Sequence, residues 1–471
     1  MLDGVLIDDI VKKVMSEMTN GGSLNVSKDS KEIKSSGFGV FESLNTAIEE
    51  AHAAQKVYNK YSLEQRREII SLLRTRLIDC VDEMSEKTVI ETKMGRKADK
   101  ILKNKLAIEK TPGVEDLVTE AFTGDDGLTL VELSAFGVLG SITPVTNPTE
   151  TIINNTISAI AGGNSIVFCP HPSAKNISIW VIQFINKIIS EAGGPKNLVT
   201  SSSEAKKENA DILFSHEKIN MLVVTGGTEI VKLALKSGKK VIGAGAGNPP
   251  VIVDETADIQ KAARDIVNGA SFDNNLPCTA EKEVLVLEIV ADYLIFNMQK
   301  EGAYKISNRE DLEKLESIVY KDGHLNKELV GKDAGYILDQ VGIKYESPPK
   351  LIIAETELSH IFVQKELMMP ILPIVRQKSF EEALKNAINV EHGLKHTAIM
   401  HSQNVTRLSI AARDMQTTIF VKNAPSYAAL GFGGEGYSTF TIAGPTGEGL
   451  TSARSFTRKR RCVLSGGFSI R

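Results

Sequence analysis

Short runs of β-branched residues alternate with helical stretches along most of this 471-residue chain. The first series begins at Gly137, and its expected strands are 138–142, 165–168, 197–200, 221–224 and 240–242. The intervening stretches 149–161, 174–192 and 228–236 have the apolar spacing of helices. Alternation of this kind predicts a parallel sheet with crossover helices, which is the usual platform for a dinucleotide.

A second alternating series begins near Val251 and continues to about Val421. It includes the expected strands 284–287, 351–354, 371–375, 397–400 and 418–421. Two α/β layers with a cleft between them follow from the two series. The stretch 40–110, which has a helical pattern, precedes both alternating series. The segment 128–133 and roughly the last thirty residues fit neither series, so we expect strands or arms there that pack against another subunit.

The first eighteen residues have the pattern of a short amphipathic helix. The apolar positions with helical spacing are Leu6, Ile7, Ile10, Val11, Val14 and Met18. Residues 19–39 are rich in Ser, Lys, Asn and Gly, as expected of a flexible linker. Such a helix either folds back onto its own domain or docks to a partner. We favour the partner, because an isolated helix of this length is marginal in water.

Composition excludes several classes of protein. A net charge of −4 and a pI near 6.2 give no reason to expect nucleic-acid binding. The most hydrophobic stretch, 284–296, is broken by Glu288 and Asp292, so we expect no membrane span. Four widely spaced cysteines without a C-x-x-C pair argue against a disulfide scaffold and against a zinc or other metal site. With no secretory signal at the N-terminus, these features predict a reducing, cytoplasmic location.

Cys278 lies in a polar, Pro-bounded loop, Ser271 to Ala280. A free cysteine is usually a small buried apolar group, so composition alone favours a structural interpretation. This loop, however, is a poor place to hide a thiol and a good place to present one. Thr279 and Ala280 could open a helix whose dipole favours the thiolate. We therefore expect Cys278 to be the nucleophile. One of the following Glu281 and Glu283 could act as a base there, but we expect both to be solvated on the outer face of the next helix or strand.

Two glycine-rich turns could approach a ligand. Thr225 to Thr228 joins a strand to a helix, and its free N–H groups either bind a phosphate or form a plain turn. The run Gly243 to Gly247 fails the dinucleotide fingerprint, because Asn248 replaces the third glycine and a strand follows instead of a helix. We interpret this run, with Gly245 at its centre, as backbone that allows close approach in the cleft. His171 and Lys175, after another strand, are either ribose or phosphate contacts or merely solvated.

After Val40 nearly the whole chain resembles the aldehyde dehydrogenase superfamily. The motifs that carry the resemblance are Thr143-Pro-Val-Thr-Asn-Pro148, Thr225-Gly-Gly-Thr228, Asn248-Pro-Pro-Val-Ile-Val-Asp254, Cys278 and Glu366-Leu-Met-Met-Pro-Ile371. The chain is most similar to the CoA-acylating members, which act on acetaldehyde, propionaldehyde or butyraldehyde. Stretches 142–150, 243–250, 273–278, 366–370 and 440–444 carry that closer similarity.

The resemblance implies roles for individual residues. Cys278 is similar to the family nucleophile, and Asn147 is similar to the amide that helps to hold the oxyanion. Glu366 is similar to the carboxylate that binds the nicotinamide ribose, and the turn at 225–228 matches the turn near the cofactor phosphates. The full set expected to bind cofactor is Thr143, Pro144, His171, Thr225, Gly226, Gly227, Thr228, Gly245 and Glu366.

One departure from the hydrolytic members is informative. Those enzymes carry a water-activating glutamate at about the position of Gly243 or Ala244, and this chain has no carboxylate there. We therefore expect NAD-dependent oxidation of a short-chain aldehyde, propionaldehyde first, with CoA taking the acyl group from Cys278 in a reversible reaction. Two alternatives are a hydrolytic aldehyde dehydrogenase that makes free acid and a non-catalytic nucleotide-binding scaffold.

The resemblance also implies an aldehyde dehydrogenase-like α/β fold. It predicts a Rossmann-like NAD/CoA-binding domain at 40–250 with arm strands at about 112–134, a catalytic domain at 251–435, and a C-terminal segment with an oligomerisation arm at 436–471. The basic run 458–461 then belongs to a subunit-contacting arm and not to a nucleic-acid site. Residues 1–18 would dock to a shell protein of a bacterial microcompartment, and the enzyme would be a homo-oligomer, a dimer or a tetramer.

Overall fold

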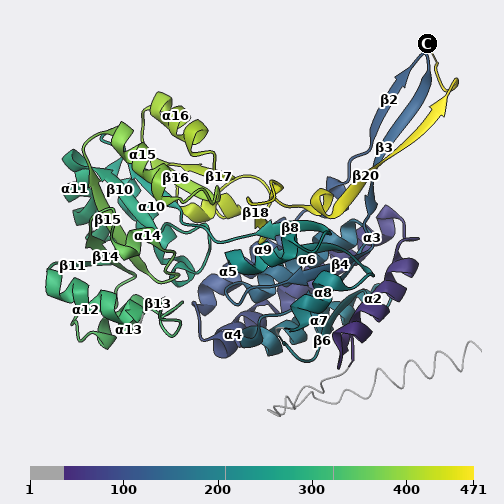
Figure 1. Ribbon diagram of the computed structural model, residues 1–471, viewed down its shortest axis with the longest axis horizontal. Helices are drawn as coiled ribbons and strands as arrows, with labels where there is room; N and C mark the ends of the chain where they lie inside the picture. Colours follow the sequence, from purple (N-terminus) through teal and green to yellow (C-terminus); the bar gives the residue numbers. More distant parts are fainter. Residues whose placement is uncertain (1–36, 207, 322, 471) are drawn as a thin grey trace, which may run out of the picture. The chain divides into compact units, whose positions relative to one another are not determined.

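The computed structural model describes residues 37–206, 208–321 and 323–470 (Figure 1). The helix expected at 1–18 and nearly all of the linker lie outside the described residues. In this part of the chain no helix combines the length and the apolar character needed to cross a membrane.

Four helices open the described chain after the short strand β1 (Val40–Phe41): α2 (Leu44–Tyr58), α3 (Leu63–Asp79), α4 (Val81–Thr92) and α5 (Lys97–Lys110). Serine caps begin the first two. Ser43 accepts a hydrogen bond from the Thr46 backbone, and Ser62 forms a capping box with Gln65. The apolar residues with helical spacing on α2 and α3 are buried, except that Val57 on α2 is exposed.

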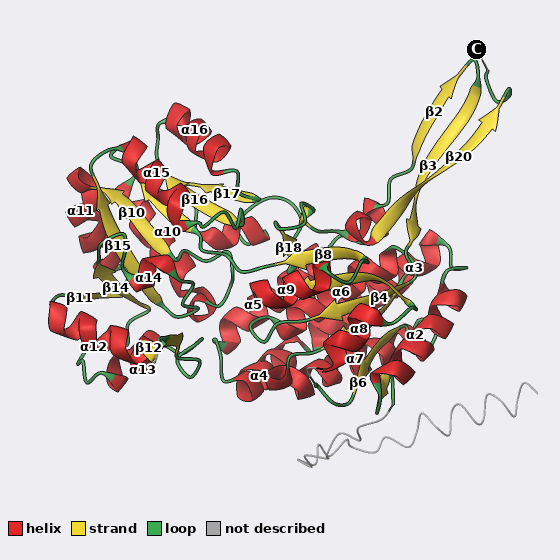
Figure 2. Ribbon diagram, in the orientation of Figure 1, coloured by secondary structure: helices red, strands yellow, loops and turns green. Residues whose placement is uncertain are grey.

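The first sheet is parallel throughout and has the strand order β1-β6-β5-β4-β7-β8. Its strands are β4 (Val138–Ile142), β5 (Ser165–Cys169), β6 (Val199–Ser202), β7 (Ile219–Thr225) and β8 (Lys240–Ala244), and its helices are α6 (Pro148–Ala161), α7 (Lys175–Glu191), α8 (Glu208–Ser215) and α9 (Thr228–Leu235). Helices α3 to α7 contribute to the core on one face, and α2, α8 and α9 contribute to the core on the other (Figure 2). The predicted parallel sheet is confirmed; β1 and α8 were not anticipated.

The second sheet is also parallel, in the order β11-β14-β15-β10-β9-β16-β17. Its strands are β9 (Pro250–Val253), β10 (Glu283–Leu287), β11 (Ala303–Ile306), β14 (Leu351–Glu355), β15 (Ile371–Gln377), β16 (Thr397–His401) and β17 (Ile419–Lys422). The helices around it are α10 (Ile259–Ser271), α11 (Glu288–Lys300), α12 (Arg309–Val319), α13 (Ala334–Gln340), α14 (Ile361–Gln364), α15 (Phe380–Val390) and α16 (Val405–Met415). A small hairpin joins β12 (Tyr320–Lys321) to β13 (His324–Leu325), and another joins β18 (Ile442–Ala443) to β19 (Gly449–Leu450).

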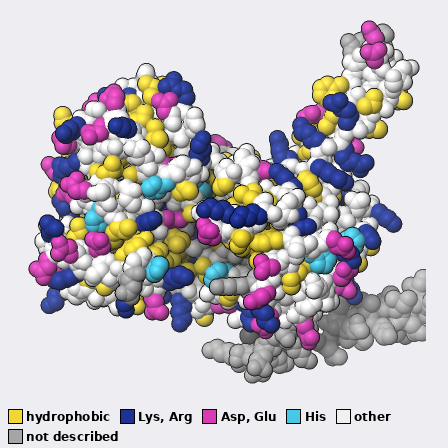
Figure 3. Space-filling model, viewed as in Figure 1, with side chains coloured by type: hydrophobic (Ala, Val, Ile, Leu, Met, Phe, Trp, Pro, Cys, Tyr) yellow, Lys and Arg dark blue, Asp and Glu magenta, His cyan; other side chains and the backbone are white. Residues whose placement is uncertain are grey.

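A three-stranded antiparallel sheet, the arm sheet, contains the segments that fitted neither series. It consists of β2 (Glu120–Gly124), β3 (Gly127–Ala135) and β20 (Thr457–Ser465). Strand β20 pairs with β3 from Thr457 opposite Ala135 to Ser465 opposite Gly127. Lysine and arginine side chains gather along this arm (Figure 3), where β20 exposes the basic run 458–461. Its contact with another subunit stays a prediction.

Candidate active site

A cavity of about 290 Å³ lies at the carboxyl ends of several strands of the first sheet and is closed by the loop that carries Cys278. Parallel sheets bind ligands at this edge. The residues predicted for the site that line it are Pro144, Asn147, His171, Thr225, Gly226, Gly227, Gly245, Cys278 and Glu366. Thr143 and Thr228 are not among the lining residues. Thr143 is buried next to Pro144, and Thr228 begins α9.

A larger cavity of about 900 Å³ opens beside β11, β14 and β15. Its charged side chains largely pair with one another: Glu355 accepts from Lys305 and from Arg376. Cys278 does not line this cavity. The smaller cavity is therefore the candidate active site.

The loop before Cys278 has an unusual backbone. Asp273, Asn274 and Asn275 have φ values of 47°, 55° and 65°, so three consecutive residues adopt the left-handed conformation. Asp and Asn tolerate this region better than other residues with a β-carbon. The signal for this geometry, Asp-Asn-Asn followed by Leu-Pro-Cys, was visible in the sequence, but its conformation was not predicted.

Each of these three side chains binds a different part of the protein. Asp273 pairs with two lysines of α5, while Asn274 Nδ2 donates to the Gly331 carbonyl at 2.9 Å and to Asp333 Oδ1 at 3.0 Å. Asn275 Nδ2 donates to the carbonyls that flank its own loop, at Ala270 and Glu281. Because these bonds satisfy the buried polar groups of the loop, they also hold the cysteine at a defined place.

The surroundings of Cys278 differ from the expectation. No helix opens at Thr279; the chain turns and enters β10 instead, so the helix N-terminus expected directly after the cysteine is not formed. Burial and the Glu366 carboxylate raise the pKa of the Cys278 thiol to about 12, although Lys282 opposes them. The helix that would favour the thiolate is therefore replaced by a loop, and this loop places the sulfur in a desolvated cavity that favours the neutral thiol.

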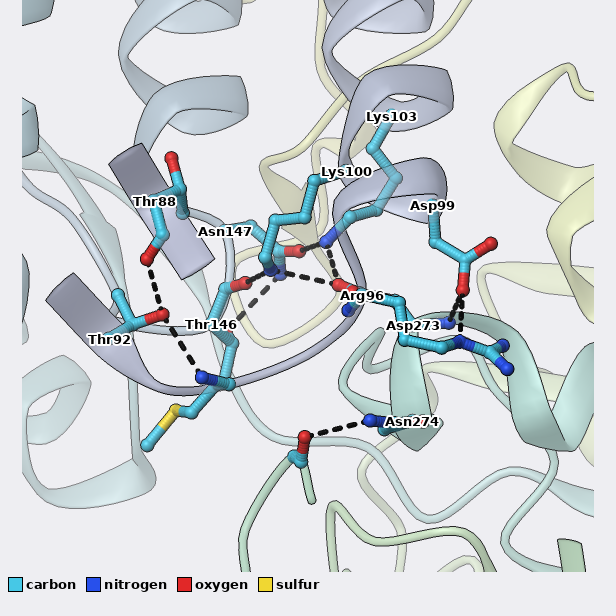
Figure 4. A network of polar contacts seen from close by, with 12 residues as sticks. Thr88, Thr92, Arg96, Asp99, Lys100, Lys103, Thr146, Asn147, Asp273 and Asn274 are labelled. Carbon is cyan, nitrogen blue, oxygen red and sulfur yellow. Dashed lines mark hydrogen bonds and ion pairs between the residues drawn. The ribbon is translucent and has the colours of Figure 1, made fainter. Parts of the chain in front are cut away.

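Asn147 stands at the N-cap position of α6, directly before Pro148. Its Oδ1 accepts a hydrogen bond from Lys103 Nζ at 2.5 Å, and its Nδ2 donates to Thr146 Oγ1 at 3.2 Å (Figure 4). One N–H of the amide is thereby left for a ligand in the cavity that Asn147 lines. This geometry suits an amide that donates to an oxyanion.

Glu366 faces the cavity from the second sheet's side, and its side chain is 16% exposed. It lies 3.7 Å from Lys282 Nζ, and burial raises its pKa while that lysine and the Gly247 N–H oppose the rise. Lys282 in turn donates to Asn275 Oδ1 at 2.7 Å, so the lysine links the carboxylate to the nucleophile loop.

Glu281 and Glu283 are fully buried, so the prediction that they are solvated was wrong. Glu281 accepts from the Ser426 N–H at 2.8 Å and from its Oγ at 2.7 Å. Neither carboxylate oxygen of Glu283 has a hydrogen-bond partner among the described residues, and burial raises the pKa of this group well above the ordinary value. The strand β10 that follows the cysteine lies in the centre of the second sheet, where both faces are covered.

The glycine run between β8 and β9 approaches the nucleophile loop closely, as interpreted from the sequence. A β-carbon on Gly247 would lie 2.8 Å from the Cys278 carbonyl oxygen and 2.9 Å from Cγ of His396. His396 is a buried residue that the sequence analysis did not single out. Its Nδ1 contacts Thr397 Oγ1 at 2.8 Å, and no hydrogen-bond partner of its Nε2 is found in the part of the chain that the structure describes.

Several features of the cavity fit a dinucleotide. At Gly227, the N-cap of α9, a β-carbon would meet nothing within 4 Å, so this helix N-terminus has open space beside it. Thr143 Oγ1 is buried next to the cavity without a partner. His171 is exposed and lines the cavity, whereas Lys175 pairs with Glu204 at 3.8 Å and does not line it. Gly227, Thr143 and His171 are therefore suitably placed to hold phosphates and a ribose.

A thiol, an amide donor and a glycine-rich turn at a helix N-terminus share one cavity between parallel sheets, and these features are typical of an enzyme that uses a covalent cysteine intermediate and a nucleotide. The family model "Aldehyde dehydrogenase family" matches residues 28–458. The chain belongs to the aldehyde dehydrogenase family.

Relatives within the family are close. A CoA-propanoylating propanal dehydrogenase of Salmonella typhimurium is 53% identical over 440 residues, which are 93% of this chain and 95% of that protein. The crystal structure of a Rhodopseudomonas palustris propionaldehyde dehydrogenase with bound CoA and an acylated cysteine has a TM-score of 0.91 and 53% identity, and it covers 93% of this chain and 100% of its own.

A second similar structure is a propionaldehyde dehydrogenase from the fucose utilisation bacterial microcompartment of Clostridium phytofermentans. Its TM-score is 0.91 at 52% identity, and the match covers 92% of this chain and 100% of that one. That protein has also been solved as a cysteine variant and as a histidine variant.

Proposed function

We propose that this protein oxidises a short-chain aldehyde, propionaldehyde first, to the corresponding acyl-CoA with NAD⁺ as the oxidant. The observation that carries the proposal is the cavity that joins Cys278 to Asn147 while the neighbouring positions, Gly243 and Ala244, carry no carboxylate. The relatives named above support propionaldehyde and CoA as the substrates.

The first chemical step is attack of the Cys278 thiolate on the aldehyde carbon. The Asn147 amide and the backbone N–H of Cys278 donate to the oxygen that gains the negative charge, and such a donor contributes about 3 kcal/mol of transition-state stabilisation. Because the pKa of the free thiol is raised to about 12, bound substrate and cofactor must favour loss of its proton. Lys282 already opposes that rise from within the site.

A bound nicotinamide would supply the acceptor for the hydride that leaves the thiohemiacetal. The turn at Thr225 to Thr228 and the N-terminus of α9 would hold the phosphates, Thr143 and Pro144 would flank the cofactor, and Glu366 would bind the ribose. Gly245 lines the same cavity and keeps its wall free of side-chain bulk.

Transfer of the acyl group completes the reaction. A thioester on Cys278 can pass to CoA by thiol exchange, because a thiol with a pKa of about 8.5 ionises readily near neutral pH. Water needs a strong general base, and Gly243 and Ala244 cannot supply one. The acyl-CoA keeps the thioester energy, so the reaction is reversible and also runs from acyl-CoA to aldehyde.

One assay tests this function: reduction of NAD⁺ by propionaldehyde with and without CoA. Turnover that needs CoA and yields propionyl-CoA supports the proposal, whereas turnover that ignores CoA would identify a hydrolytic enzyme. Absence of turnover by the folded protein under both conditions would favour a nucleotide-binding scaffold. Cys278→Ala should abolish the reaction without unfolding the chain, and repeating the assay with NADP⁺ sets the cofactor preference.

We further propose that residues 1–18 bring the enzyme into a bacterial microcompartment by docking to a shell protein. The amphipathic pattern of the segment and the microcompartment origin of one relative support this. Deleting residues 1–18 should leave turnover unchanged and abolish co-purification with shells. Normal retention in the shell would contradict the targeting role.

We also propose that the arm sheet joins subunits into a dimer or a tetramer.

A further inference from the structure

A buried lysine of α5 contacts both halves of the candidate active site. Lys103 Nζ donates to Asn147 Oδ1 at 2.5 Å and pairs with Asp273 Oδ2 at 2.5 Å (Figure 4). Asp273 lies in the loop that leads to Cys278, whereas Asn147 lies after β4 of the first sheet. One ammonium group therefore joins the amide of the site to the loop of its nucleophile.

The chemistry of the ammonium group determines how the amide is turned. An amide presents one acceptor oxygen and one donor nitrogen, and an ammonium group can only donate. Asn147 must therefore point Oδ1 at Lys103, which directs Nδ2 away from the lysine. The Nδ2 bond to Thr146 Oγ1 at 3.2 Å supports the same orientation. A neutral partner that both donates and accepts would permit either orientation of the amide.

Lys103 stays charged in this setting. Burial lowers its pKa, but the carboxylates of Asp273 and Glu150 outweigh burial and raise the pKa above the ordinary value of a lysine. Glu150 Oε1 lies 3.3 Å from the ammonium nitrogen. The side chain of Lys103 is fully buried, so solvent does not compete for its three donors.

The neighbouring Lys100 provides an internal comparison. It is equally buried and also pairs with Asp273 Oδ2, at 2.9 Å, but its other bond goes to the Thr146 carbonyl at 2.9 Å. Both lysines belong to one cluster of charges. Of the two, Lys103 is the one that donates a hydrogen bond to the Asn147 side chain.

We propose that Lys103 is a positioning residue of the reaction. It turns the Nδ2 group of Asn147 into the cavity, and through its ion pair with Asp273 it fixes the position of this amide relative to Cys278. Lys103 does not line the cavity, so it acts through Asn147 and not on the substrate. The inference rests on the proposed function, in which the Asn147 amide holds the oxyanion.

A double-mutant cycle tests the proposal. Lys103→Met removes the ammonium group with little change in length, and Lys100→Met is the matched control that removes one cation from the same cluster. Each is made in the wild-type protein and in Asn147→Ala, and folding is checked by circular dichroism and thermal melting. The readout is the rate of the first turnover of NAD⁺ to NADH at saturating propionaldehyde.

Lys103→Met should lower this rate about tenfold to a hundredfold, below the loss of roughly 10²–10³-fold that follows removal of an oxyanion donor. The KM for the aldehyde should change less than kcat. In the Asn147→Ala background the same substitution should cost less than about threefold, because coupled residues are not additive. Lys100→Met should cost the same factor in both backgrounds.

Equal losses from Lys103→Met in the two backgrounds would overturn the proposal. Should that variant not fold, Lys103→Gln enters the same cycle, since its neutral amide allows Asn147 to turn either way. Failure of both to fold would show that the role is structural and would also overturn it. The wild-type protein can need CoA for turnover while the double-mutant cycle is additive. That pair of results would overturn the role of Lys103 and leave the proposed function standing.

Discussion

The carbonyl oxygen of Cys278 lies 2.8 Å from the position that a β-carbon on Gly247 would occupy. The nucleophile loop and the glycine run after β8 therefore touch through their backbones, with no side chain between them. His396 closes the other side of Gly247, at 2.9 Å from the same position. Position 247 requires glycine because there is no space for a β-carbon. Its backbone conformation does not require glycine, since its φ lies outside the left-handed region.

Gly247→Ala should lower kcat about tenfold to a hundredfold while the protein still folds. The added carbon must push the Cys278 backbone aside, and misplacement of a reacting group by about 1 Å can cost roughly 10²-fold in rate. Gly124→Ala on β2, where a β-carbon meets nothing within 4 Å, is the control and should keep wild-type kcat. Wild-type kcat in Gly247→Ala would show that the close approach has no bearing on the nucleophile.

Alkylation of Cys278 in the protein without substrates should rise steeply with pH. Because burial and Glu366 raise the pKa of this thiol to about 12, the thiolate fraction grows about tenfold per pH unit. Labelling by iodoacetamide, followed by mass spectrometry of the Cys278 peptide, should accelerate about a hundredfold from pH 7 to pH 9. Glu366→Gln should react faster at every pH. A plateau below pH 8 would indicate a pre-formed thiolate.

Gly227→Ala should weaken cofactor binding without disturbing the fold. A β-carbon there meets nothing within 4 Å in the protein alone, but it would enter the space where the cofactor phosphates are expected. We expect the KM for NAD⁺ to rise about tenfold, which corresponds to about 1.4 kcal/mol, with the aldehyde KM and the melting temperature unchanged. An unchanged KM for NAD⁺ would show that the cofactor phosphates do not bind at this turn.

Stability should depend on pH through Glu281. Burial raises the pKa of this carboxyl to about 7, although hydrogen bonds from Ser426 oppose the rise. The folded state then holds a proton that the unfolded state releases near pH 4.5, so the free energy of unfolding falls as pH rises from 4.5 to 7, by about 3 kcal/mol from this group. Urea unfolding from pH 5 to pH 8 should show a weaker pH dependence in Glu281→Gln; an identical slope would assign the effect to other groups.

Much of the fold was predictable because it follows from local periodicity. The strands at 138–142 and 397–400 and the helix at 149–161 match the observed elements closely, since their apolar residues repeat at the spacing of a buried strand or helix. Short edge elements such as β1 and the hairpin of β12 and β13 were missed. They contain too few residues to show a period.

The residues of the candidate site were named from motifs, and most of them line one cavity. Their supports were not named. Lys100 and Lys103 lie three residues apart on α5, but Asp273 is far from both in the sequence, and each of the three alone has the character of a solvated charge. Only after folding do they meet and satisfy one another, so no pattern in a single segment could indicate them.

The sequence by itself therefore determined the alternation that builds two parallel sheets, the cysteine, and the absence of a carboxylate at Gly243 and Ala244. The tertiary structure alone decided the electrostatics of the site. It places the half-buried thiol of Cys278 beside Glu366, buries Glu281 and Glu283 within the body, and brings Lys103 to Asn147. The physical reason is that a pKa and a hydrogen-bond partner depend on what surrounds a group in space, whereas helices and strands depend on the residues next to it in the chain.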